Sequence, residues 1–190
     1  DVYKRQIQNA FSMCTECRKY YPEFRVSINL SYVQILKSPL MMVLKQIIDH
    51  SGISCSGIIV ELTESGYLEG TPAVRSVWND MKKLRIQIAL DDFGTGYSNL
   101  MNISNLEPDI VKLDRGFTLK ALSRSYEYQL MQYVIEMVHK LNQYVCVEGV
   151  ETKEDLEKIK ALGPDLIQGY YYSKPCSRDE FLKKFFGYSE

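Results

Sequence analysis

The sequence predicts an α/β protein of the TIM-like (β/α) barrel type, in which parallel strands alternate with helices. Two observations lead to this prediction: six strand-like segments alternate with helix-like segments along the chain, and each strand has a polar residue near its carboxyl end. The chain has 190 residues, of which 45% are hydrophobic and 25% charged, enough for one ordinary domain with a buried core.

The strand-like segments are short runs rich in β-branched and apolar residues. They are expected at 25–31, 57–64, 86–92, 109–115, 144–150 and 165–170.

The helix-like segments have apolar residues three or four positions apart. They are expected at about 7–21, 39–50, 72–84, 123–142, 153–162 and 178–186, with a short helical turn at about 97–103. Thr71 before Pro72 is a plausible N-cap, and Thr152 with Asp155 predicts a capping box. Gly52 and Gly163 are expected to end the helices that precede them.

Polar residues recur in phase at the strand ends. Side chains alternate between the two faces of a strand, so each of these residues lies opposite the apolar face of its own strand. The six residues are Asn29, Glu61, Asp91, Lys112, Glu148 and Gln168. In a doubly wound sheet helices would cover both faces, and polar residues repeated on one face would be unexplained. In a barrel all six residues would lie at the carboxyl ends of the strands, where active sites are found.

A closed barrel of this type needs about eight strands, and the chain supplies six. We therefore expect a single partial domain over residues 1–190 that lacks its first two strands.

Charge and composition exclude several classes of function. A net charge of −1 argues against a DNA or RNA polymer as partner, and no apolar run approaches the roughly 20 residues of a membrane span. The Cys14–Cys17 pair lies in a predicted helix without a second pair, which favours ordinary thiols over a zinc site. A cytoplasmic domain is expected, with a membrane tether in the full-length protein left open.

Six motifs follow one another along the chain. They are SINLSYVQ (27–34), VELTES (60–65), DDFGTGYSNL (91–100), VKLDRGF (111–117), VEGVET (147–152) and IQGYYYSKP (167–175). In this order they resemble the EAL family of cyclic di-GMP phosphodiesterases. The Glu-Ala-Leu motif that names the family, and the arginine that follows it, are absent from these residues. Their absence agrees with the finding that the chain supplies six of the eight strands of a closed barrel.

The resemblance implies hydrolysis of cyclic di-GMP to linear pGpG with two Mg²⁺ or Mn²⁺ ions. The implied metal ligands are Asn29, Glu61, Asp91 and Asp92, oxygen donors of the kind that such hard cations prefer. Because Asp92 follows Asp91 directly, it points to the other side of the strand unless the chain turns. We expect Gly94 and Gly96 to provide that turn.

The remaining site residues are assigned by the same resemblance. Lys112 would act near the attacking water, as a base partner or as a charge stabiliser, while the alternative is a salt bridge with Glu148 or Asp114. Glu148 and Gln168 would contact the metal region and orient water or substrate, and Tyr170 could stack on a guanine or serve strand-end packing.

Two further residues, Glu64 and Glu151, are implied to support the DDFGTG loop. A homodimer is also implied, through 93–106 and 117–135. The aromatic residues there, which include Phe93, Phe117, Tyr126 and Tyr133, look exposed, although ordinary core packing explains them as well. An upstream sensory or GGDEF domain is expected in the native protein.

Two alternatives to this enzymatic function remain. One is an inactive receptor or scaffold that binds cyclic di-GMP, and the other is a barrel enzyme for another phosphodiester.

Overall fold

A computed structural model describes residues 2–31, 34, 39–63, 72–95, 103 and 107–187. The chain divides into two compact units. Unit 1 comprises 1–62, 69–88 and 175–190, and unit 2 comprises 63–68 and 89–174.

The strands are short and follow one another across the sheet in chain order, β1-β2-β3-β4-β5-β6. They are β1 (Val26–Asn29), β2 (Ile58–Thr63), β3 (Gln87–Phe93), β4 (Ile110–Leu113), β5 (Tyr144–Val147) and β6 (Leu166–Ile167). Pairing is parallel between β1 and β2, and between successive strands from β3 to β6. Parallel strands in chain order with intervening helices confirm the predicted α/β barrel class.

The helices agree with the predicted segments except at the first helix, which was predicted at 7–21 and begins and ends four to five residues earlier, and around residues 115–142. They are α1 (Val2–Cys17), α3 (Leu40–Ser51), the 3₁₀ turn η1 (Cys55–Gly57), α5 (Pro72–Lys83), α7 (Arg115–Ser123), α8 (Ser125–Lys140), α9 (Lys153–Lys160) and α10 (Arg178–Phe186). The single helix predicted at 123–142 begins only at Ser125, and α7 precedes it, because Asp114 caps α7 by accepting a hydrogen bond from Gly116 N. Of the predicted turn at 97–103, only Ile103 is described, and it is helical; residues 97–102 and the Thr71 cap lie outside the described residues.

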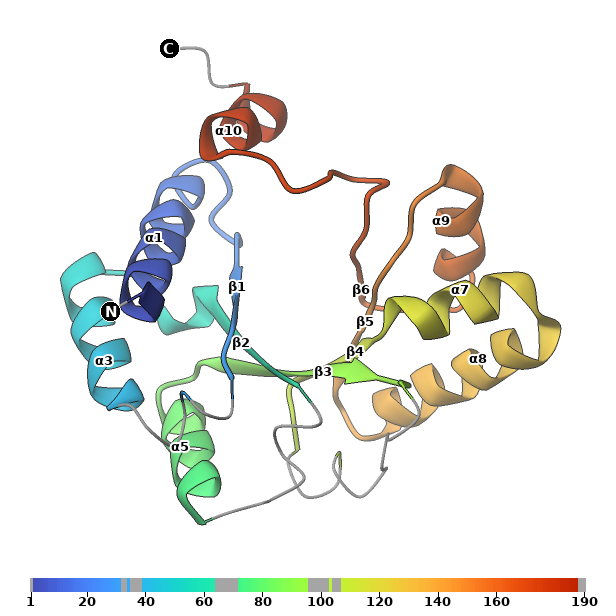
Figure 1. Ribbon diagram of the computed structural model, residues 1–190, viewed down its shortest axis with the longest axis horizontal. Helices are drawn as coiled ribbons and strands as arrows, with labels where there is room; N and C mark the ends of the chain where they lie inside the picture. The colour runs from blue at the N-terminus through green and yellow to red at the C-terminus, as the bar shows by residue number, and fades with distance from the viewer. Residues whose placement is uncertain are drawn as a thin grey trace. The chain divides into compact units, whose positions relative to one another are not determined.

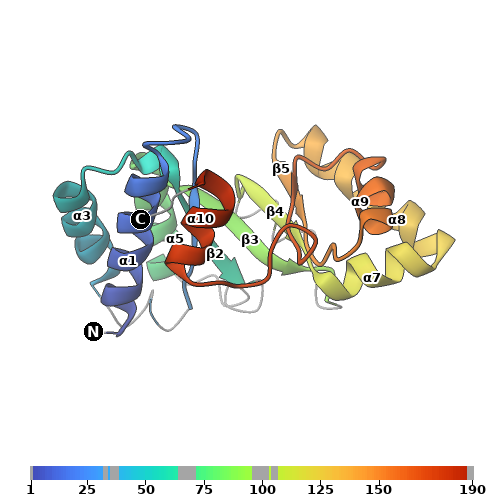
Figure 2. The ribbon, with the colours of Figure 1, turned by 90° about the horizontal axis from the view of Figure 1, so that it is seen from above.

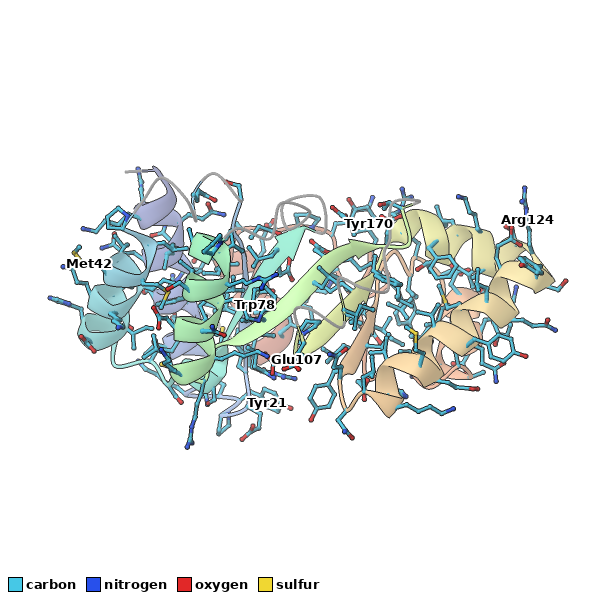
Figure 3. All side chains as sticks on the ribbon, turned by 90° about the horizontal axis from the view of Figure 1, so that it is seen from below. Tyr21, Met42, Trp78, Glu107, Arg124 and Tyr170 are labelled. Carbon is cyan, nitrogen blue, oxygen red and sulfur yellow. The ribbon has the colours of Figure 1, made fainter. Side chains whose placement is uncertain are left out.

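In unit 1, helices α1, α3 and α5 lie on one side of β1 and β2 (Figures 1 and 2). They bury apolar side chains such as Phe11, Leu44 and Met81, none of which is measurably exposed. Figure 3 shows Trp78 directed from α5 toward the strands, and its side chain is 5% exposed. Burial of apolar area of this kind is the main stabilising contribution to such a unit.

The C-terminal helix α10 packs on α1 within unit 1. Arg178 Nη2 lies 2.5 Å from Oε2 of Glu16, and the ring of Tyr20 lies 5.3 Å from that of Phe186. Ser177 and Glu180 form a capping box at the start of α10. The Ser177 donors hold the pKa of Glu180 below its usual range.

In unit 2, helices α7, α8 and α9 lie on one side of β4 and β5 (Figures 1 and 2). Val111, Met131 and Val145 are buried without measurable exposure. The predicted Thr152–Asp155 capping box opens α9, and Gly163 adopts the left-handed conformation just after it.

Candidate active site

Asp91 and Asp92 lie in a β-bulge of β3. Leu90 pairs with Val111 of β4 and Phe93 with Leu113, so the two aspartates together oppose the single residue Lys112. Asp92 has a φ of 60°, the left-handed conformation that bulges use to insert an extra residue. The irregularity breaks the strict alternation of side chains that would send neighbouring aspartates to opposite faces.

The change in backbone direction therefore begins within β3, earlier than the sequence predicted. We expected Gly94 and Gly96 to turn the chain, but Asp92 itself takes the unusual conformation, and its N–H donates to Oδ1 of Asp91 at 3.0 Å. Gly94 also has a positive φ of 103°. A Cβ there would lie 2.9 Å from the Phe117 ring, and Gly96 lies outside the described residues.

Lys112 lies between two carboxylates. Its side chain is 5% exposed, and its Nζ lies 3.1 Å from Oδ1 of Asp91 and 2.7 Å from Oε1 of Glu148. Of the two salt bridges that the sequence left open, the structure contains the one with Glu148, while Asp114 caps α7 instead. A buried ammonium needs such partners because desolvation disfavours an isolated charge.

Backbone pairing sets this geometry. Lys112 of β4 is in register with Cys146 of β5, and the N–H of Glu148 donates to the carbonyl of Leu113 at 3.1 Å. Glu148 thus leaves the end of β5 beside the end of β4, where its carboxylate meets the lysine.

Asn29 and Glu61 are neighbours in unit 1. They are partners in the parallel register of β1 and β2, and the Glu61 side chain accepts a hydrogen bond from the Ser27 hydroxyl. Glu61 is only 8% exposed, whereas Asn29 is exposed. Ser27 was not predicted as a site residue, although its position two residues before Asn29 puts it on the same face.

The other predicted site residues of unit 2 follow β5 and β6. Gln168 is exposed, and its backbone N–H donates to Val147 O at 2.9 Å. Tyr170 is 54% exposed, and the Nζ of Lys174 lies 5.8 Å from its ring centroid. Glu151 forms an ion pair with Arg115; Glu64 lies outside the described residues.

The donor chemistry fits divalent cations in part. Asp91, Asp92, Asn29 and Glu61 offer only oxygen ligands, which suit Mg²⁺ or Mn²⁺. Within the described ranges, however, no cluster of three or more histidine, cysteine, aspartate and glutamate side chains is arranged to hold a metal ion.

Of the four aromatic residues for which a dimer surface and core packing were both left open, two are buried. Phe93 is 4% and Phe117 8% exposed, because both pack into the core of unit 2, where Phe117 lies against Gly94. Tyr126 and Tyr133 of α8 are 74% and 67% exposed, as expected.

A family model for the EAL domain matches residues 3–175. The chain belongs to the EAL family. It is 30% identical over 169 residues to the cyclic di-GMP phosphodiesterase PdeF of Escherichia coli strain K12, covering 89% of this chain and 23% of PdeF. It is 29% identical over 178 residues to the probable cyclic di-GMP phosphodiesterase PdeB of the same strain, covering 93% and 33% of the two chains.

Solved EAL structures have the same fold. The EAL enzyme Bd1971, solved with cAMP and cyclic di-GMP, is 26% identical with a TM-score of 0.90, covering 96% of this chain and 51% of that one. BlrP1 of Klebsiella pneumoniae, solved as a calcium and cyclic di-GMP complex, has a TM-score of 0.83 at 24% identity, covering 92% and 44%.

This EAL chain spans about a quarter of the length of PdeF and a third of PdeB. Among its described helices, none has the length and hydropathy needed to cross a membrane.

Proposed function

We propose that this EAL chain hydrolyses one phosphodiester bond of cyclic di-GMP to give linear pGpG. The proposal rests on the buried Lys112, whose ammonium lies between the carboxylates of Asp91 and Glu148. Asp92 adds a third carboxylate at the bulge of β3. A buried lysine among carboxylates near the end of a barrel strand is typical of an active site. The names of PdeF and PdeB supply the substrate.

We further propose that two Mg²⁺ or Mn²⁺ ions take part. Asn29 and Glu61 of unit 1 would contribute oxygen ligands to one ion, Asp92 to the other, and Asp91 to both. When bound, such ions activate water and neutralise charge on a phosphodiester. The calcium in the BlrP1 structure agrees with a need for divalent cations.

The protein side chains have separate roles in the proposed reaction. Lys112 would lie near the attacking water, where its charge stabilises negative charge that develops at phosphorus. Water attacks in line and the ribose 3′ oxygen leaves. Glu148 holds Lys112 in place and contacts the metal region, and Gln168 orients water or substrate.

The exposed ring of Tyr170 is proposed to stack on a guanine. The nearby Lys174 ammonium would then occupy one side of the ring and leave the other open to the base. Glu64 and Glu151 are proposed to support the DDFGTG loop.

Further proposals concern the whole protein. We propose that residues 1–190 are one partial EAL domain, and that the natural protein carries the missing strands and a sensory or GGDEF domain upstream. A homodimer through α8 and a cytoplasmic location are also proposed. All five cysteines are thiols rather than disulfides, as in a reducing compartment.

The test is product chromatography on the full-length protein with cyclic di-GMP and Mg²⁺ or Mn²⁺. We expect pGpG from the natural protein and none from Glu61→Ala, while Glu136→Ala, on the exposed part of α8, retains activity. Calorimetric titration with cyclic di-GMP in Ca²⁺ separates binding from turnover. Binding without product in the natural protein would establish a receptor instead, and turnover of only another phosphodiester would establish a different enzyme.

A further inference from the structure

Arg115 and Glu151 form an ion pair across two loops of unit 2. The Nε and Nη2 atoms of Arg115 lie 3.2 and 2.7 Å from the same oxygen, Oε1 of Glu151. Arg115 begins α7 directly after β4, and Glu151 lies between β5 and α9. Arg115 is not among the site residues predicted from the sequence.

The Arg115–Glu151 pair joins the same two parts of the chain as the Lys112–Glu148 pair of the proposed active site. Arg115 lies three residues after Lys112, and Glu151 lies three residues after Glu148. The hydrogen bond from Glu148 N to Leu113 O joins the same two segments. The segment 148–151 is therefore tied to the end of β4 at both of its ends.

The stem of Arg115 also packs on the backbone between these ends. Gly149 has a φ of 81°, and a Cβ at that position would lie 2.3 Å from Cγ and 2.8 Å from Cβ of Arg115. Only glycine combines this conformation with such a close approach. Arg115 thus contacts the 148–151 segment in its middle as well as at Glu151.

The same segment holds the residues that follow β6. Val150 N donates to Gln168 O at 3.3 Å, and Tyr171 N donates to Val150 O at 3.0 Å. A Cβ on Gly169 would lie 2.0 Å from Val150 O, so the two backbones lie in close contact. A shift of 148–151 would therefore move the Gln168–Tyr170 segment with it.

We propose that Arg115 is a positioning residue for the phosphodiesterase reaction, an inference that rests on the proposed function. By holding Glu151, it fixes Glu148 against Lys112 and fixes the Gln168–Tyr170 segment. The two side chains are 58% and 38% exposed, and ion pairs at such positions contribute about 1 kcal/mol or less to stability. Loss of the pair should therefore change geometry without unfolding the protein.

The test compares Arg115→Gln, Glu151→Gln and the double variant in the full-length protein. Since small misplacements of catalytic groups cost one to two orders of magnitude in rate, we expect kcat to fall about tenfold in each. We expect KM to change less than kcat and the melting temperature to stay within about 2 °C. The double variant should be no slower than either single one, because both remove the same contact. Arg115→Lys should recover only part of the rate, because a compact ammonium replaces the planar guanidinium.

Arg124→Gln is the matched control. It removes the exposed Arg124–Glu127 pair, whose N–O distance is 3.2 Å, and Figure 3 shows Arg124 at the end of unit 2 remote from Tyr170. Its kcat should not change. Hydrogen exchange gives a readout that is independent of turnover: amides of 148–151 should exchange faster in Arg115→Gln than in Arg124→Gln.

The outcomes are distinguishable. If the natural protein yields no pGpG, the proposed function fails, and hydrogen exchange still tests whether Arg115 holds 148–151. Unchanged exchange and unchanged kcat in Arg115→Gln would overturn the inference. So would additive losses in the double variant, or a fall in melting temperature large enough to explain the lost rate.

Discussion

The Nζ atom of Lys112 lies 2.7 Å from Oε1 of Glu148, and this ion pair joins the ends of two neighbouring strands, β4 and β5. The same ammonium lies 3.1 Å from Asp91 at the bulge of β3. One positive charge thus faces two carboxylates, with Asp92 adding a third at the bulge. The excess negative charge favours the binding of cations.

The first prediction concerns removal of that ammonium. Lys112→Met removes the ammonium that lies between the carboxylates of Asp91 and Glu148, so we expect loss of hydrolysis and a lower free energy of unfolding. Breaking a fully buried pair costs about 3–5 kcal/mol, and the partial exposure of both carboxylates should put the value near the lower end. Urea denaturation and product chromatography measure the two effects. Lys120→Met, at an exposed position of α7, is the control, and equal behaviour of the two variants would contradict the prediction.

The second prediction separates the backbone role of Asp92 from its charge. Because Asp92 has a φ of 60°, Asp92→Asn and Asp92→Gly should preserve the bulge, while Asp92→Val should lower the unfolding free energy by about 1–2 kcal/mol. All three should lose turnover if the carboxylate binds metal. Thermal unfolding of the three proteins beside the natural one gives the comparison. A valine variant as stable as the asparagine variant would show that the bulge does not need this conformation.

The third prediction uses two glycines with similar backbone conformations. A Cβ at Gly149 would collide with Arg115, whereas at Gly163, with φ of 74°, nothing lies within 4 Å. Gly163→Ala should lose about 1 kcal/mol of stability from the left-handed conformation alone. Gly149→Ala should lose more, and it should also reduce turnover because Glu148 is its neighbour. Equal destabilisation in denaturant titrations would mean that Arg115 moves aside without cost.

The fourth prediction tests the proposed homodimer. Tyr126, Leu130 and Tyr133 follow one another at i, i+4 and i+7 on α8, and they are 74%, 42% and 67% exposed. Tyr133→Glu should convert a dimer to a monomer in light scattering of the full-length protein. Met42→Glu, at an exposed position of α3 in unit 1 (58% exposed; Figure 3), should leave the mass unchanged. A natural protein that is monomeric at every concentration would contradict the proposal.

The fifth prediction concerns thiol reactivity. Burial raises the pKa of Cys17 to about 11, with a smaller contribution from Cys14, and burial also raises the pKa of Cys14. A raised pKa leaves little reactive thiolate at neutral pH, so both should resist alkylation until the protein unfolds. Cys176 is exposed and should react first. Mass spectrometry after brief treatment with iodoacetamide should find label at Cys176 and none in its Cys176→Ser variant; rapid labelling of Cys17 in the folded protein would refute this.

Local signals in the sequence predicted most of the elements. Pro72 marked a helix start, Gly52 marked a helix end, and α5 and α10 lie where periodicity predicted them. Helix α7 was missed because Gly116 and Thr118 lower helix propensity, and because its Asp114 cap was assigned to the preceding strand.

The site was predictable in composition but not in geometry. The phase of polar residues along strands identified Lys112 and Glu148, which the structure brings into contact. The bulge at Asp92 depends on pairing with β4, so no local pattern in β3 indicates it. Arg115 and Glu151 lie 36 residues apart in sequence and meet only after β4 and β5 have paired.

The contact between Arg178 and Glu16 joins residues 162 positions apart in the sequence. Folding of unit 1 therefore requires two segments far apart in the sequence to meet, and contacts of such long range slow folding. During synthesis the surface of α1 that α10 covers stays open until α10 itself has been made, a period in which exposed apolar surface invites aggregation or chaperone binding. Removal of α10 should therefore reduce the yield of folded protein, although α10 contributes none of the proposed site residues.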